Sequence, residues 1–411
     1  MGLQVTSTLR VFVPTRHLEG NLLFHGMVYL LPPLALAVAW LYVAGMNARA
    51  IREWRKSDDH WSERARILYP IREAAKANLW LLPINCTAAA YAFRTSDPAI
   101  LTAIFLMALT GALLGTYRFD KELFPRFTFH GWLRSVIVGW VFSLSFIVGL
   151  IAVTLFMPAT FGLGTALIGM GLLIYALAQQ YGLWIWLLQK GRLLVAAPDR
   201  LVELVQRVSV QSGIKFQSVW MFESPVGYAA AFPMTGDLVF SEGMLFTQSD
   251  VEIEAICAHE LAHLDEPRKT KMIRLVTSIR LLPIVFIRPV MQTFKLPGVL
   301  ALALVFVLLM VLARKIGRKM EVRADDAARH FQLEPGVYAS ALEHLYQMNH
   351  MPAVMPQTRN VHPHLYDRML AAGITPSYPR PDKPERISGH GDLMSVCLGV
   401  LVLAVLFKMF H

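Results

Sequence analysis

Long apolar runs, several of them close to 20 residues, constrain the fold of this 411-residue chain more than any other feature of its sequence. A helix needs about 20 mostly apolar residues to cross the hydrocarbon core of a bilayer, which is about 30 Å thick. The clearest candidates are Leu22–Met46, Pro98–Tyr117, Leu133–Met157, Gly164–Leu188 and Leu296–Ala313, and three less regular ones are Leu79–Phe93, Leu281–Phe294 and Leu393–Phe407. The sequence therefore predicts a mainly α-helical, polytopic membrane bundle of about seven or eight spans.

Composition excludes several other classes of protein. Ala, Val, Ile, Leu, Met, Phe, Trp, Tyr and Cys make up 55% of the chain and charged residues only 17%, against about 25% charged residues in an ordinary soluble domain. So much apolar material excludes a disordered chain, and three cysteines in 411 residues exclude a disulfide-rich scaffold. The net charge of +10 falls between the apolar runs, which favours membrane topology over a nucleic-acid partner.

Basic residues follow every second apolar run. They gather in residues 49–76, 118–134, 190–192 and 314–323. Because Lys and Arg are enriched in cytoplasmic loops, the alternation places these segments in the cytoplasm and both termini outside. Two long polar regions, Gln189–Thr270 and Lys315–Gly391, then share the cytoplasmic side. A bacterial inner membrane suits this arrangement, and the endoplasmic reticulum is the alternative.

The first polar region ends in a motif typical of zinc peptidases. Ser249 and Glu252 form a Ser-x-x-Glu capping box that starts a helix. On that helix His259 and His263 are four residues apart, so both imidazoles project from one face and can reach a single ion. Glu260 lies beside the first of them, in the His-Glu-x-x-His arrangement whose glutamate acts as general base on a metal-bound water. The alternative is a pair of surface histidines on an amphipathic helix.

A third metal ligand is expected in the second polar region, because catalytic zinc takes three protein ligands and keeps one position for water. Glu321 and Asp325 are four residues apart on a predicted helix. Glu321 would complete a site for one Zn²⁺ per chain, and Asp325 would accept a hydrogen bond from a ligand histidine. The alternative is a charged helix whose acids merely offset Arg318 and Arg323.

Two further polar segments lie near these motifs. His362 and Arg368 come from the sequence His-Pro-His-Leu-Tyr-Asp-Arg. Their side chains can bind a peptide carbonyl, or stabilise the oxyanion that forms when water attacks it; otherwise the segment is a polar loop. Asp265 and Glu266, just after the histidine motif, are expected at a solvated helix end.

Short strands are predicted before the histidine motif, over residues 216–222, 228–232 and 238–240, where aromatic and aliphatic residues are separated by Ser-Pro and Thr-Gly-Asp turns. An edge strand of such a sheet can hold an extended substrate through main-chain hydrogen bonds. The alternative is a small sheet that only packs against the helix.

In this order the motifs resemble those of the M48 membrane zinc metallopeptidases, a family that includes the HtpX quality-control proteases and the CAAX prenyl proteases. The resemblance covers roughly residues 211–370, and the five apolar runs before the motif are more similar to the CAAX prenyl protease plan. It implies one zinc, held by the two motif histidines and the distal glutamate, with His362 and Arg368 near the substrate. Members usually carry an Asn-Ala pair before the catalytic helix, where this chain has Val226, which has no side-chain donor.

These features predict a membrane-integrated, zinc-dependent endopeptidase that cleaves peptide or membrane-protein substrates at the cytoplasmic face and contacts membrane lipid. The expected organisation is membrane helices in 1–188, a zincin-like α+β catalytic domain in two halves, 189–270 and 315–391, around a membrane hairpin, 271–314, and a last span in 392–411. The alternatives are an M56-like signalling metalloprotease, or a non-catalytic membrane scaffold or transporter that keeps a structural metal site.

Overall fold

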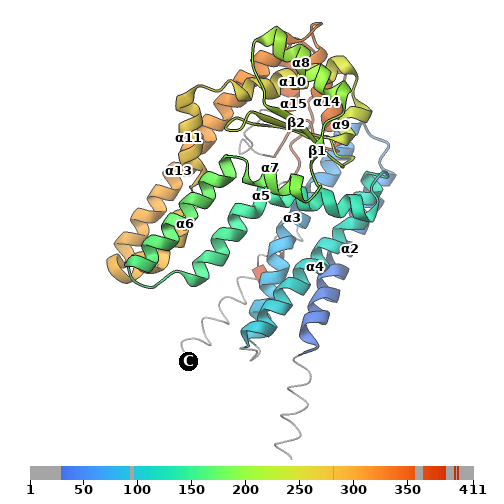
Figure 1. The fold of residues 1–411 in the computed structure, drawn as a ribbon. Helices are drawn as coiled ribbons and strands as arrows, with labels where there is room; N and C mark the ends of the chain where they lie inside the picture. The colour runs from blue at the N-terminus through green and yellow to red at the C-terminus, as the bar shows by residue number, and fades with distance from the viewer. Residues whose placement is uncertain are drawn as a thin grey trace, which may run out of the picture. The chain divides into compact units, whose positions relative to one another are not determined.

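The computed structural model describes residues 29–92, 97–280, 282–356, 364–385, 393–394 and 396–397. The described chain is mostly helical and contains one four-stranded sheet, so the mainly α prediction is confirmed (Figure 1). The chain forms two compact units, the first made of Met1–Glu53, Pro70–Phe119 and Ile387–His411, and the second of Trp54–Tyr69 and Asp120–Arg386.

Most residues of helices α2 (Leu31–Lys56), α3 (Trp61–Ala92) and α4 (Pro98–Leu123) belong to the first unit. Their shared core is rich in small residues, including Ala39, Ala74, Ala108 and Ala112. Gly111 lets α2 and α4 approach closely, because a Cβ at this position would lie 2.2 Å from the Leu36 carbonyl oxygen. Small residues at four-residue spacing, here Gly111 and Gly115, are typical of helix contacts in membranes.

The second unit contains α5 (Phe129–Phe156), α6 (Leu163–Gln180) and α7 (Leu183–Lys190). The predicted run Gly164–Leu188 is therefore not one helix, and this part of the prediction was wrong. The chain breaks at Gly182, whose φ of +87° lies in the left-handed region that only glycine adopts easily. The polar pair Gln179 and Gln180 ends α6 just before this break.

A small sheet follows, with β1 (Val195–Ala196), β2 (Ser218–Phe222), β3 (Ala229–Phe232) and β4 (Asp237–Ser241) in the order β1-β2-β4-β3. β2 and β4 run parallel, and the other two pairs are antiparallel. The three predicted strands are present with shorter or shifted ends, whereas the two-residue β1 was not predicted. Strand β3 forms one edge of the sheet.

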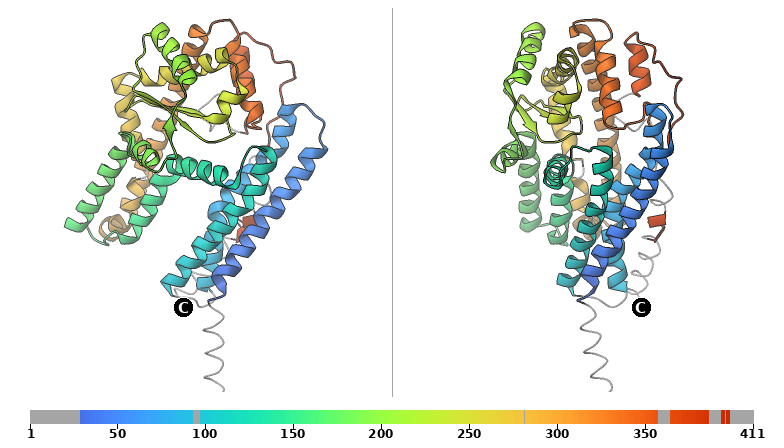
Figure 2. Two further views of the ribbon diagram at one scale, coloured as in Figure 1. Left: turned by 45° about the vertical axis from the view of Figure 1, so that its right-hand side comes forward. Right: turned by 90° about the vertical axis from the view of Figure 1, so that its right-hand side faces the viewer.

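The remaining helices are α8 (Asp199–Ser212), α9 (Glu242–Thr247), α10 (Asp250–Leu264), α11 (Arg268–Ser278), α12 (Leu282–Val285), α13 (Ile287–Phe331), α14 (Val337–Met348) and α15 (Leu365–Ala371). Helix α10 is the centre of the unit, since every residue from Glu252 to Leu264 is buried. It packs against α8, β3, α13 and α14 (Figure 2). The predicted capping box is present: the Ser249 N–H and hydroxyl both donate to the Glu252 carboxylate, at 2.9 Å each.

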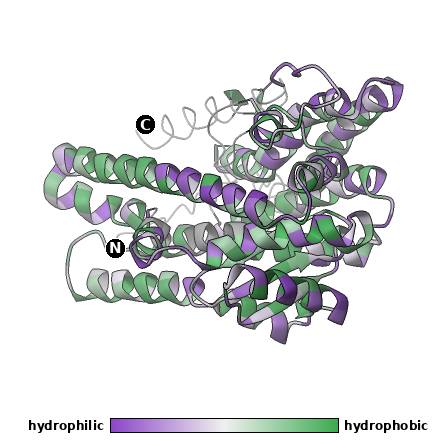
Figure 3. Cartoon of the chain, turned by 90° about the horizontal axis from the view of Figure 1, so that it is seen from above, coloured by the Kyte–Doolittle hydropathy of each residue, from purple (hydrophilic) through white to green (hydrophobic). Residues whose placement is uncertain are grey.

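Helix α13 joins an apolar segment to a charged one without ending between them. It kinks at Lys295, where φ is 54° and ψ is −150°, and then continues to Phe331. In the predicted run Leu281–Phe294, the described residues 282–294 are divided between α12 and the start of α13. Figure 3 shows the change along the helix from hydrophobic green to hydrophilic purple.

Among the described residues, four helices are long and apolar enough to cross a membrane, namely α2, α4, α6 and α13. None of the residues in the most apolar 18-residue window of α13 is buried. In the predicted run Leu79–Phe93, the described residues 79–92 form the end of the longer, partly charged α3. The run Leu393–Phe407 lies almost wholly outside the described residues. The count of seven or eight spans stays a prediction.

Candidate metal centre

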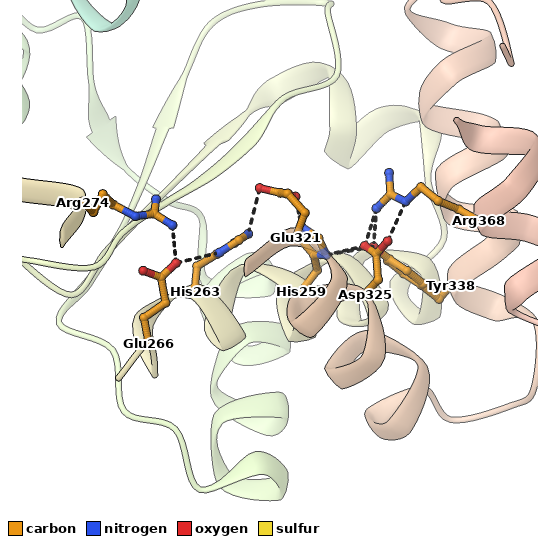
Figure 4. A network of polar contacts seen from close by, with 8 residues as sticks. All are labelled: His259, His263, Glu266, Arg274, Glu321, Asp325, Tyr338 and Arg368. Atoms are coloured by element: carbon orange, nitrogen blue, oxygen red, sulfur yellow. Dashed lines mark hydrogen bonds and ion pairs between the residues drawn. The ribbon is translucent and has the colours of Figure 1, made fainter. Parts of the chain in front are cut away.

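Three predicted metal ligands lie together in the second unit. His259 and His263 project from α10, and Glu321 reaches them from the charged part of α13 (Figure 4). One ligand atom from each residue lies within 4.8 Å of the others. His259 Nε2 is 3.5 Å from Glu321 Oε2, and His263 Nε2 is 3.6 Å from Glu321 Oε1.

The two histidine–glutamate distances and the donor types fit a single zinc ion. Tetrahedral zinc with bonds of about 2.0–2.2 Å holds its ligand atoms about 3.3–3.5 Å apart, whereas a good N–H···O hydrogen bond is shorter, at about 2.9 Å. The two imidazoles and the carboxylate are largely buried. Two histidines and a glutamate are also a known ligand set of catalytic zinc, which keeps a fourth position for water.

Glu260 lies next to the first ligand and is 8% exposed. Within the part of the chain that the structure describes, its carboxylate makes no hydrogen bond or ion pair. Partial desolvation of the Tyr228 hydroxyl and the nearby Glu260 charge raise the pKa of Tyr228 to about 12, although the residue as a whole is 40% exposed. The Tyr228 hydroxyl therefore lies near the Glu260 carboxylate. Glu260 is therefore enclosed by protein but is not engaged as a partner in the networks around the two histidines.

His259 is held by a buried network on the side away from Glu321. Its Nδ1 lies 2.8 Å from the Tyr338 hydroxyl and 3.2 Å from Asp325 Oδ1. The Tyr338 hydroxyl donates to Asp325 Oδ1 at 2.6 Å. Arg368 donates to both Asp325 oxygens, at 2.9 and 2.5 Å, and to the Tyr338 oxygen at 2.7 Å.

The charges around His259 favour its protonated form when no ion is bound. Burial by itself would lower the pKa of His259, but the Asp325 and Glu321 carboxylates outweigh it and raise that pKa to about 9. A metal ligand must be the neutral imidazole. Binding of an ion here would therefore release a proton, and Nε2, the atom that faces Glu321, would be freed for coordination.

His263 has a separate partner. Its Nδ1 lies 3.2 Å from Glu266 Oε1, and Arg274 of α11 donates to the same oxygen. The Glu266 side chain is only 1% exposed, so the prediction of a solvated helix end was wrong for this residue. The neighbouring Asp265 is exposed, as predicted.

The structure places the remaining predicted residues as follows. Arg368 lies against Asp325 and Tyr338, and not among the ligand atoms. His362 falls outside the described residues. Val226 lies in the turn before β3, where its N–H donates to the Ser224 hydroxyl at 3.2 Å.

Sequence reasoning missed Tyr338, Glu266 and Arg274. For Glu266 a signal existed, because it stands only three residues after His263, at the end of the same helix. Tyr338 reaches His259 across 79 positions of sequence, and no local pattern could have indicated that contact.

A His-Glu-x-x-His helix and a distal glutamate, brought together beside a small sheet, define the second unit as a metallopeptidase-type domain. Residues 197–373 match the sequence profile of peptidase family M48. Two curated relatives, each named protease HtpX, from Shewanella sp. strain W3-18-1 and Shewanella putrefaciens strain CN-32, are 39% identical over 67 residues.

That similarity covers 16% of this chain and 23% of each relative. The chain thus matches less than a quarter of the length of these curated relatives. No solved structure matches it significantly.

Proposed function

We propose that this chain is a membrane-integrated, zinc-dependent endopeptidase that hydrolyses peptide bonds at the cytoplasmic face of a membrane. The observation that carries the proposal is the meeting of His259, His263 and Glu321, whose ligand atoms come from two helices and lie within 4.8 Å of one another. The match to peptidase family M48 and the protease names of the relatives support the same activity.

In the proposed site, His259, His263 and Glu321 would hold one zinc ion per chain. When bound, zinc would supply Lewis acidity, which acidifies water and polarises the scissile carbonyl. Glu260 takes a proton from the attacking water and delivers it to the leaving amine. Its burial and its lack of a hydrogen-bond partner among the described residues suit this role.

Several other residues would prepare the site. Asp325 and Tyr338 would hold His259 with its Nδ1 protonated, so that Nε2 faces the ion. For Arg368, the two bonds to Asp325 support a positioning role, and its predicted contact with a substrate carbonyl, like that of His362, is a separate proposal. The edge strand β3, beside α10, offers main-chain groups to an extended substrate.

Membrane insertion is supported by the four long apolar helices. The cytoplasmic orientation, the bacterial inner membrane and the membrane-protein substrates rest on the distribution of basic residues and apolar runs in the sequence. An enzyme of this kind would meet its substrates at or near the lipid surface.

The test uses full-length protein in detergent and compares the wild type with Glu260→Gln. We expect one zinc per chain in both proteins, cleavage of a quenched fluorescent peptide library by the wild type, and loss of that cleavage in the variant. A chelator should abolish the wild-type activity, and zinc should restore it. Zinc without hydrolysis in the wild type would instead favour the non-catalytic scaffold, and turnover by Glu260→Gln at the wild-type rate would exclude the proposed base.

A further inference from the structure

Asp265 and Glu266 directly follow the histidine helix α10, and they connect it to two other helices, α11 and α13. Glu266 contacts α11, which comes directly after α10, and Asp265 contacts α13, which supplies Glu321. Hydrogen bonds and ion pairs therefore join these two residues to the helices that come before and after α12 in the sequence.

Glu266 fixes the ring of His263. Because His263 Nε2 faces Glu321, Nδ1 has to carry the proton when the histidine acts as a ligand, and it then donates to Glu266 Oε1 at 3.2 Å. The carboxylate is almost fully buried, and Arg274 supplies the opposite charge. A buried acceptor of this kind selects one tautomer and one ring orientation of a ligand histidine.

Helix α11 is in turn bound to the end of α10. Lys271, three residues before Arg274, donates to the Leu264 carbonyl at 2.8 Å and to the Pro233 carbonyl at 3.0 Å. Lys271 and Arg274 share one face of α11. This face of α11 therefore binds the Leu264 carbonyl, next to His263, and also the Glu266 side chain, which contacts the His263 ring.

Asp265 completes the connection on the other side. Arg323, two residues after Glu321, donates to the Asp265 carbonyl at 2.9 Å and to Oδ2 at 2.7 Å. Both side chains are partly exposed, so the pair adds little stability. The pair joins the end of α10 to α13, the helix that supplies Glu321.

We propose that Glu266, held by Arg274, is a positioning residue for His263. This inference rests on the proposed zinc site. It assigns a metal-affinity role to the chain segment just after the histidine motif, in addition to the partners of His259.

The experiment measures zinc affinity of the full-length protein in detergent, by competition with a chromophoric chelator, together with the visible spectrum after cobalt substitution. Glu266→Ala should weaken zinc binding about 10- to 100-fold and change the cobalt spectrum. Glu266→Gln should lie between this variant and the wild type, because the amide oxygen still accepts the histidine N–H. Glu254→Gln is the matched control. Glu254 is a buried carboxylate on α10, the helix that carries His263, and it pairs with Arg207 at 2.7 Å.

The possible results separate this inference from the proposed function. If both Glu266 variants bind zinc as tightly as the wild type and Glu254→Gln, the inference is wrong, but the proposed zinc site stands. A lower melting temperature of Glu266→Ala, with unchanged zinc affinity and cobalt spectrum, would show a purely structural role and would also overturn it. A wild type that binds no zinc would overturn both proposals.

Discussion

The Tyr338 hydroxyl lies 2.8 Å from Nδ1 of His259, closer than the carboxylate of Asp325 at 3.2 Å. The hydroxyl accepts from the imidazole and from Arg368 and donates to Asp325. The acid predicted to orient His259 therefore acts largely through a tyrosine from another helix.

Removing this hydroxyl should weaken the metal site. We expect Tyr338→Phe to bind zinc about 10- to 100-fold less tightly, because the His259 N–H loses its nearest acceptor. Chelator competition on the purified protein measures the change. Tyr378→Phe is the control, since it removes another buried hydroxyl, which contacts the Met369 sulfur at 3.9 Å, and it should leave zinc affinity unchanged. Equal affinities for the two variants would contradict the role of Tyr338.

The third ligand should be essential for metal retention. Glu321→Gln replaces a charged carboxylate ligand by a neutral amide, so the variant should lose its zinc during purification, as measured by atomic absorption. Asp326→Asn changes an exposed acid on the same helix, paired with Arg329, and should keep one zinc per chain. Full zinc occupancy in Glu321→Gln would remove this residue from the site.

Arg368 should matter for stability as well as for zinc. Replacing it by Met leaves the Asp325 charge buried without its cation, and breaking a buried pair in this way costs about 3–5 kcal/mol. We expect the loss in the free energy of unfolding to be smaller when Asp325→Asn is added, because the stranded charge is then gone. Chemical denaturation of the two single variants and the double variant measures the coupling. Additive losses would show that the two side chains do not depend on each other.

Glu252 should make the stability of the catalytic helix depend on pH. Burial by itself would raise the pKa of this carboxyl, but hydrogen bonds from Ser249 and Ser340 and the nearby His344 hold it below the ordinary value of 4.5. A carboxyl whose pKa is lower in the folded state stabilises the fold above its unfolded pKa and loses this effect as pH falls through the folded value. The wild type should therefore exceed Glu252→Gln in melting temperature at pH 7, by an amount that shrinks as pH falls below the ordinary value of 4.5. A difference that stays constant with pH would contradict this explanation.

The metal ligands could be predicted because their spacing is local. His259 and His263 form a pair within one helix turn, and Glu321 and Asp325 form another, so each pair is visible without knowledge of the fold. What could not be predicted is which other residues contact these pairs and the end of their helix. The contact between Tyr338 and His259, and that between Arg323 and Asp265, join distant parts of the sequence and depend on how α13 and α14 pack on α10.

The apolar runs, too, could be predicted only in part. Apolar composition identified the segments that become α2, α4, α6 and the middle of α13. It did not reveal the break at Gly182 or the kink at Lys295, because average hydropathy carries no information about backbone torsions. Nor did it show that the apolar and charged parts of α13 form one continuous helix after the kink. Because they do, the helix that contains the apolar run also supplies Glu321.

The central claim is that two imidazoles and one carboxylate bind a single zinc ion, and X-ray absorption at the zinc edge tests it most directly. For the wild-type protein we predict one zinc per chain with only nitrogen and oxygen neighbours at about 2.0–2.2 Å, including the scattering pattern of two imidazole rings. Loss of one imidazole in His263→Ala should be visible in the same spectrum. A sulfur neighbour at about 2.3 Å, or no bound zinc in the wild type, would contradict the account.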